Sequence, residues 1–378
     1  MTEKYLHYLW GSKQFPAVDT VLTNGESVLV KSIGEYNENL KGPDFKFGAV
    51  KFGDVVEYGS IEIHLKGSDW YTHNHHLDKN YDNVILHVVY ENDKPVFQNG
   101  RQIPTLELKG FIDSRNIEKE KVNRFFNYSF PCANGLNQIA PFYLKRMIDL
   151  AMVKKLNTKQ NQLREFVNGS NSEIFYTLLV VAFGMKVNQN LFLELLEELP
   201  YDLMLSLKKT GRLCQFTNAL TEKLEHSASW NTKGMRPNGF PKVRINQLLR
   251  ILEFHDLENL TDVLLKGSAN EVLIYFYSAC KSAGLTRDFA KHLSVNVLAP
   301  FFWWVGDVSQ VDSFQDKSIK LLLLISPEKN NELNKIQEVF GNANNAYESQ
   351  ALIALNRFYC SGKKCLSCDI GNKVLNRL

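Results

Sequence analysis

The chain has 378 residues, of which 44% are hydrophobic and 22% are charged, and its formal net charge is +3. This is the composition of a globular protein with a sizeable core, and the length suggests about two or three domains. The small net charge excludes a chain that binds nucleic acid through its overall charge, so such binding would need a local basic patch.

The ends and apolar runs of the sequence predict a cytoplasmic protein that is not bound to a membrane. The first residues, MTEKYLHYLWGSKQ, lack the basic region and apolar run of a signal peptide. The longest apolar runs are far shorter than the ~20 residues that a membrane-spanning helix needs. Six cysteines in 378 residues are too few for a disulfide scaffold.

The first 112 residues have the pattern of a short helix followed by a sheet. Residues 1–14 favour a helix, and five apolar or alternating runs, separated by Gly, Asn and Asp turn signals, favour strands at 28–33, 49–52, 60–65, 84–90 and 105–108. Two of them, Ile61–Leu65 and Val84–Val89, are typical of central strands. We therefore predict a mixed-sheet α/β domain over residues 1–112.

The remainder of the chain favours helices. Residues 112–127 are charged and helix-prone, and apolar side chains recur with a 3.6-residue period over 140–300. We predict a mainly helical domain over 113–345, then a helix and a cysteine segment over 346–378. The predicted class is α+β.

Histidines gather in the N-terminal region. Five of the nine lie between positions 64 and 87, where a random scatter would place about half of one. They are His64, His73, His75, His76 and His87, and acidic residues lie among them or before them at Asp44, Glu62, Asp69, Asp78 and Asp82.

The sharpest pattern joins Asp44 to the predicted strand that holds Glu62 and His64. Side chains two residues apart on a strand leave the same face, and a carboxylate at the turn before Phe45 can reach them across a hairpin. Two carboxylates, the Ile63 carbonyl and waters are ligands that suit Mg²⁺ or Mn²⁺. The sequence thus predicts a phosphoryl-transfer site with Asp44 and Glu62 as metal ligands.

Pro43-Asp44 followed by Glu62-Ile-His64 resembles the signature of the PD-(D/E)xK nucleases, in which Asp follows Pro and a later strand carries Glu-x-Lys. The resemblance implies a restriction-endonuclease core and metal-dependent hydrolysis of nucleic-acid phosphodiester bonds. His64 stands in the lysine position, where it would position or deprotonate the attacking water. Lys66 or His73 would then stabilise charge.

Four segments, at residues 40–45, 61–64, 69–75 and 78–89, together with the C-terminal cysteine run, make the chain similar to DUF2851, a bacterial family of unknown function. This resemblance implies no established activity.

Two other interpretations of the histidines stay open. Asp69, His73, His75, His76 and Asp78 have a spacing that can hold Zn²⁺ with one position left for water, as in a zinc hydrolase. Alternatively the domain is a degenerate nuclease core, a non-catalytic module that binds nucleic acid or protein. His87, on an apolar strand, is expected in the core, where it can hydrogen-bond His64 or His73.

The C-terminal cysteines have the spacing C-x4-C-x2-C, at Cys360, Cys365 and Cys368. Cys132 is the preferred fourth ligand, and Zn²⁺ and an iron–sulfur cluster both fit. The role of this cysteine metal site would be structural. Cys214 and Cys280 lie in helical patterns and are expected to be buried.

A loop-like segment over 227–241, together with the start of the helix that follows, carries the four cations Lys233, Arg236, Lys242 and Arg244. These cations predict contacts with DNA or RNA, or else a solvated loop between helices. The oligomeric state is open.

Overall fold

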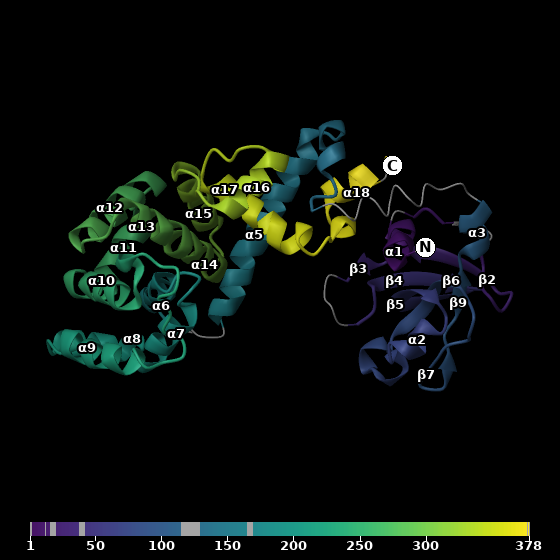
Figure 1. Ribbon diagram of the computed structural model, residues 1–378, viewed down its shortest axis with the longest axis horizontal. Coiled ribbons are helices and arrows are strands. Elements are labelled where there is room, and N and C mark those ends of the chain that lie inside the picture. Colours follow the sequence, from purple (N-terminus) through teal and green to yellow (C-terminus); the bar gives the residue numbers. More distant parts are fainter. Residues whose placement is uncertain are drawn as a thin grey trace. The chain divides into compact units, whose positions relative to one another are not determined.

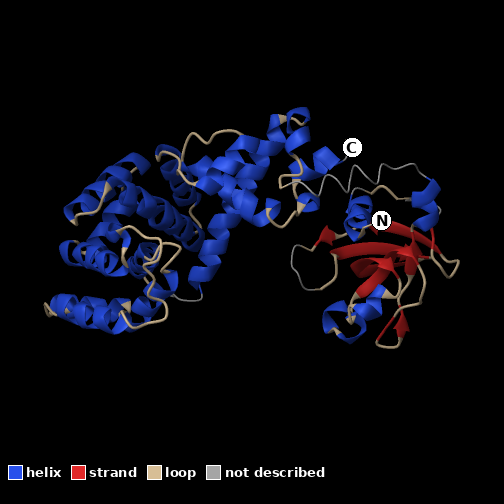
Figure 2. Cartoon of the chain, in the orientation of Figure 1, coloured by secondary structure: helices blue, strands red, loops and turns tan. Residues whose placement is uncertain are grey.

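The computed structural model describes residues 2–11, 13–15, 20–37, 42–114, 129–164, 169–375 and 377 (Figure 1). A mixed sheet near the N-terminus is followed by a mainly helical region, so the α+β class is confirmed (Figure 2). The chain divides into two compact units: unit 1 holds residues 1–149 and 355–378, and unit 2 holds 150–354. The predicted domain boundaries after 112 and 345 stay predictions, and most of the segment 112–127 lies outside the described residues.

Unit 1 is built on a seven-stranded sheet with the order β1-β2-β4-β5-β6-β9, in which β3 also pairs with β4. The strands are β1 (Thr20–Val21), β2 (Ser27–Ser32), β3 (Glu35–Tyr36), β4 (Phe45–Phe52), β5 (Val55–Lys66), β6 (Val84–Glu91) and β9 (Thr105–Glu107). A separate pair is formed by β7 (Phe97–Gln98) and β8 (Arg101–Gln102). The five predicted strands are present, and the additional strands have two residues each, too few to show a period.

The strands up to β5 pair antiparallel, whereas β6 is parallel to β5 and β9 is parallel to β6. A tight turn at Gly53, with φ +53°, joins β4 to β5. Farther along β5, a Cβ on Gly59 would lie 2.4 Å from the Asn83 carbonyl oxygen. Glycine there lets the chain that enters β6 approach β5 closely.

Because β5 and β6 are parallel, the chain must cross over between them. The crossover holds α2 (Asp69–Thr72) and the single turns η1 (His75–Leu77) and η2 (Lys79–Tyr81). Trp70 anchors it in a core cluster with Tyr81 and Val96. Helix α1 (Glu3–Gly11), as predicted near the N-terminus, also packs on β5, and Figure 1 shows α1 and α2 on opposite sides of the sheet.

The other described elements of unit 1 are helices and helical turns. It comprises α3 (Lys109–Ser114), η3 (Ala133–Gln138), the start of α5 (Pro141–Arg164), the π-helical turn η6 (Asn356–Cys360), η7 (Cys365–Ser367) and α18 (Asp369–Leu375).

Unit 2 consists of packed helices, as the periodicity over 140–300 predicts. They are α6 (Asn171–Phe183), α7 (Gln189–Glu198), α8 (Tyr201–Lys209), α9 (Leu213–Leu224), η4 (Pro237–Gly239), α10 (Pro241–Phe254), α11 (Leu257–Lys266), α12 (Ala269–Ser282), α13 (Arg287–Leu293), η5 (Ser294–Leu298), α14 (Ala299–Ser309), α15 (Asp312–Leu324), α16 (Asn331–Phe340) and α17 (Ala346–Leu355). Phe175 meets Phe276 and Phe301 edge to face in the core. No described helix has both the length and the apolar character needed to cross a membrane.

One histidine of unit 2 is held neutral by its surroundings. The Nε2 of His292 lies 3.2 Å from the Ala182 carbonyl oxygen, and its ring stacks on Phe289. Burial lowers the pKa of His292 to about 4, and the nearby Lys159 and Arg244 contribute to the lowering.

Candidate metal centre

The central strands place Glu62, His64 and His87 on one face of the sheet. Glu62 and His64 leave the same face of β5, as predicted, and are only 4% and 1% exposed. Glu62 lies opposite His87 in the parallel register of β5 and β6. The His64 Nδ1 is 2.8 Å from the His87 Nε2, so the predicted hydrogen bond between these two rings is present.

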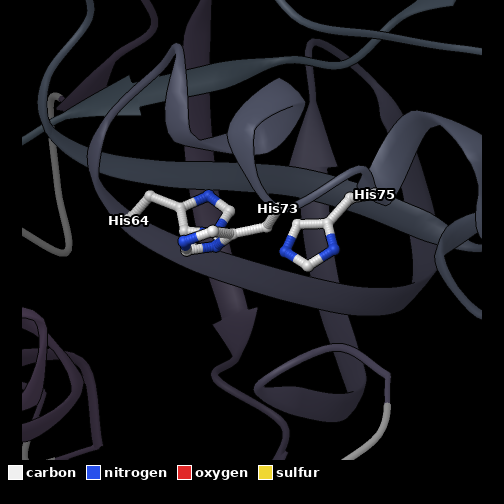
Figure 3. A group of neighbouring side chains, drawn as sticks. All are labelled: His64, His73 and His75. Atoms are coloured by element: carbon white, nitrogen blue, oxygen red, sulfur yellow. The ribbon is translucent and has the colours of Figure 1, made fainter.

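The crossover adds two imidazoles to this face. Asn74 adopts a left-handed conformation, with φ +61°, that small polar side chains tolerate. On its two sides, the His73 Nδ1 lies 3.1 Å from the His64 Nε2, and the His75 Nε2 lies 3.2 Å from Glu62 Oε1. One ring nitrogen from each of His64, His73 and His75 lies within 4.8 Å of the others (Figure 3).

These separations suit ligands that share one cation. The His64 Nε2 is 3.5 Å from Glu62 Oε1, so the close pairs in the cluster lie between 3.1 and 3.5 Å. A tetrahedral ion with bonds of ~2.0–2.1 Å places its ligand atoms about 3.4 Å apart. His64, His73 and His75 therefore have the donor type and spacing of ligands to one ion, and the Glu62 carboxylate lies next to two of them, His64 and His75.

Asp44 reaches the cluster from the residue before β4. Its main-chain N–H donates to Glu62 Oε2 at 2.9 Å, and the Ile63 N–H donates to Asp44 Oδ2 at 3.0 Å. This reciprocal pair holds the two acidic residues side by side. The Asp44 carboxylate also meets the His7 Nε2 of α1 at 3.1 Å, and Glu3, His7 and Asp44 form a second group whose ligand atoms lie within 4.8 Å.

Burial sets the charges in the cluster. It raises the pKa of Glu62 well above the ordinary range, and the Asp44 carboxylate adds to this effect. Burial lowers the pKa of His64 to about 2, with a further contribution from His87, and burial lowers the pKa of His75 to about 4. Neutral imidazoles keep the lone pairs that bind a metal, and a bound cation would offset the cost of a buried carboxylate.

His7 has the opposite charge preference. Although burial lowers its pKa, the Asp44 carboxylate raises the value above that of a free histidine. The ring is thus favoured as an imidazolium beside Asp44. Sequence reasoning missed this role, since only the packing of α1 on β5 brings positions 7 and 44 together.

Other predicted site residues lie outside this group. Lys66 is exposed at the end of β5, where its main-chain N–H donates to the Asp69 carboxylate at 2.9 Å. His76 packs beside Tyr71, with ring centroids 5.1 Å apart, and Asp78 accepts from the Asn80 N–H at the start of η2. Of the ligands in the alternative zinc prediction, His73 and His75 contact side chains of β5, whereas His76 contacts Tyr71 and Asp78 caps η2.

The predicted nucleic-acid residues divide into two kinds. Lys233 and Arg236 are exposed. Lys242 forms an ion pair with Glu225 at 3.1 Å, and the Arg244 guanidinium lies 3.5 Å above the centre of the Phe289 ring. Arg244 is therefore part of the packing of unit 2.

The predicted cysteine ligands all belong to unit 1. Cys132, Cys365 and Cys368 are buried and Cys360 is partly buried, and their metal binding stays a prediction at this point. Cys280 is buried as expected, but Cys214 is exposed on α9, so the expectation of burial was wrong there.

The fold and the cluster define an α+β protein whose N-terminal mixed sheet carries a group of histidines and acids, in which Glu62 and His64 are buried and His73 is exposed. The chain belongs to DUF2851, described as a protein of unknown function, whose family model matches residues 3–221 and 206–331. The match includes the whole cluster and ends before the C-terminal cysteines. The comparisons with curated proteins and with solved structures found no match. They give no support to the resemblance to PD-(D/E)xK nucleases.

Proposed function

We propose that the cluster binds one divalent metal ion and hydrolyses phosphodiester bonds of nucleic acid. The observation that carries this proposal is the spacing of His64, His73 and His75, which suits a single cation, with the Glu62 carboxylate 3.5 Å from His64 and 3.2 Å from His75. Three imidazoles and one carboxylate favour Mn²⁺ or Zn²⁺ over Mg²⁺, which prefers oxygen ligands.

A metal ion in this position would lower the pKa of a bound water and neutralise charge on the phosphate. The chain's own residues prepare the site. When the His64 Nε2 lone pair is used for the metal, the His64 Nδ1–H donates to the His87 Nε2 2.8 Å away, and this hydrogen bond fixes the ring of His64. The His7 Nε2 lies 3.1 Å from Asp44 Oδ2, so a protonated His7 would place a positive charge next to Asp44, the role that the nuclease signature gives to lysine.

A nucleic-acid substrate is supported by the order of the acids along the chain. Asp44 stands at the start of β4 and Glu62 on the neighbouring antiparallel β5, an arrangement similar to that of the PD-(D/E)xK signature in a restriction-endonuclease core. In unit 2, the exposed cations Lys233 and Arg236 offer separate contacts to a phosphate backbone.

The test is cleavage of single-stranded and double-stranded DNA and RNA by the full chain, first stripped with chelator and then given Mn²⁺. Glu62→Gln removes a ligand without changing the size of the side chain, and His76→Ala is the matched control from the same crossover. We expect Glu62→Gln to lower the rate at least about 100-fold, in line with what disturbed metal sites lose. Equal cleavage by wild type and Glu62→Gln would overturn the proposal.

The three-imidazole set also supports a second candidate, a zinc hydrolase that acts on another bond. It predicts that Zn²⁺ supports hydrolysis of a simple carboxylic ester while every nucleic acid stays intact. A non-catalytic module, by contrast, would bind nucleic acid equally well with and without chelator.

A further inference from the structure

Four cysteines from two distant parts of the sequence meet in unit 1. Cys132 directly precedes η3, Cys360 ends η6, Cys365 begins η7, and Cys368 directly follows η7. Both η3 and η7 pack on α18, and η6 packs on η7. The segment around residue 132 and the returning C-terminal segment thus bring all their thiols to one region.

The backbone around these thiols is closely fitted. A Cβ on Gly371 would lie 2.6 Å from the Cys365 carbonyl oxygen, so only glycine allows this approach. The Cys368 sulfur accepts hydrogen bonds from the main-chain N–H groups of Ile370 and Gly371. Such donors stabilise a thiolate, which is the form that binds metals.

The charges of the four thiols influence one another in every pairing. Burial raises the pKa of Cys132 and of Cys365 to about 12, and the neighbouring thiols contribute to the rise in both. Together with the packing of η3, η6, η7 and α18, these mutual influences indicate that the four thiols lie near one another.

The spacing of the sulfurs bears on which metal group they can hold. A single zinc ion with bonds of ~2.3 Å holds its four sulfurs about 3.8 Å apart. Among the residues that the structure describes, two compact groups have ligand atoms within 4.8 Å of one another: His64, His73 and His75, and Glu3, His7 and Asp44 (together, the His and acid cluster). Neither group contains a cysteine. In a cubic iron–sulfur cluster each thiolate binds a different iron at a separate corner, so the sulfurs stand farther apart.

We propose that Cys132, Cys360, Cys365 and Cys368 ligate an iron–sulfur cluster. The iron–sulfur cluster links the C-terminal segment of unit 1 to the segment that contains Cys132. Its role is structural, and it does not depend on the hydrolytic function proposed for the His and acid cluster.

The test is metal analysis of the full chain, purified without oxygen. We expect about four iron and four sulfide per chain, together with a visible absorption band that bleaches on reduction. Cys132→Ser loses the iron, whereas the control Cys280→Ser, which changes a buried cysteine of unit 2, retains it.

The wild-type chain alone decides the question if Cys132→Ser does not fold. One zinc and no iron per chain would overturn the cluster, and so would a chain that contains neither metal. Thiol alkylation gives an independent measure: we expect the exposed Cys214 to react in the native chain and the four ligand cysteines to react only after the iron is removed. Rapid alkylation of all four in the iron-containing chain would also overturn the proposal.

Discussion

Replacing Glu62 by glutamine separates two effects of this side chain on the free energy of unfolding. One is the cost of burying the acid without metal, and the other is the stabilisation that it gives when metal is bound. The glutamine side chain keeps an oxygen that can accept from the Asp44 N–H, as Glu62 does, but it carries no charge. Without metal, Glu62 is an acid whose pKa is raised by burial and by Asp44. We therefore expect the metal-free variant to be at least as stable as the metal-free wild type.

With metal bound, we expect the wild type to be more stable than Glu62→Gln. At a metal concentration of 100 times the dissociation constant, the wild type gains about 2.7 kcal/mol of unfolding free energy. If the loss of one ligand in four weakens binding about 100-fold, the variant gains only about 0.4 kcal/mol at the same concentration. Unit 1 has about 170 residues, for which 1 kcal/mol shifts the melting temperature by roughly 2–4 °C. The expected shifts are about 5–10 °C for the wild type and about 1 °C for Glu62→Gln.

The assay is calorimetry of the full chain, stripped with chelator and titrated with Mn²⁺. Mn²⁺ is chosen because thiolates prefer softer metals, so the cysteine site contributes little to the shift. His76→Ala, from the same crossover, should keep the wild-type response. The reasoning is refuted if Glu62→Gln gains as much from Mn²⁺ as the wild type does.

Three further predictions concern the fold. Gly59→Ala should lower the free energy of unfolding by about 1–3 kcal/mol, because the added Cβ meets the main chain. Gly110→Ala, whose Cβ meets nothing within 4 Å, should be neutral or stabilising. Urea unfolding of both variants measures the difference. Arg244→Ala should cost about 1–2 kcal/mol through its lost ring contact, while Arg236→Ala leaves the melting temperature unchanged, and equal losses would contradict the packing. His292 takes up a proton near pH 6.5 when unfolded but only near pH 4 when folded, so wild-type stability should fall as the pH drops through this range, by about 3 kcal/mol at most. His292→Gln should lose less over the same range, and identical pH dependence in urea unfolding would rule out this contribution.

Local patterns predicted most elements because they depend on neighbours in the sequence. Alternation in 60–65 and 84–90 predicted β5 and β6, and it placed Glu62 and His64 on one face. The same alternation placed His87 within reach of His64. It did not predict β1, β3, β7 or β8, whose two residues each are held by pairing with other strands rather than by any local preference.

The composition of the metal cluster was predictable only in part. The sequence singled out the histidines between 64 and 87 but did not distinguish His75 from His76, which are adjacent and identical in type. The left-handed turn at Asn74 and the burial of Trp70 decide which ring faces β5. Lys66 was expected near the site because it shares a strand face with Glu62 and His64, yet it lies exposed at the strand end.

By itself, the sequence determined the α+β class, the order of the central strands along the chain and the residue types available for metal binding, since periodicity and spacing are properties of neighbouring residues. Only the tertiary structure decided that β5 and β6 pair in parallel, that the resulting crossover brings His73 and His75 to β5, and that α1 sets His7 beside Asp44. The physical reason is that these contacts join residues far apart in the sequence, and they form because burying the apolar faces of the sheet and of α1 fixes where their polar side chains meet.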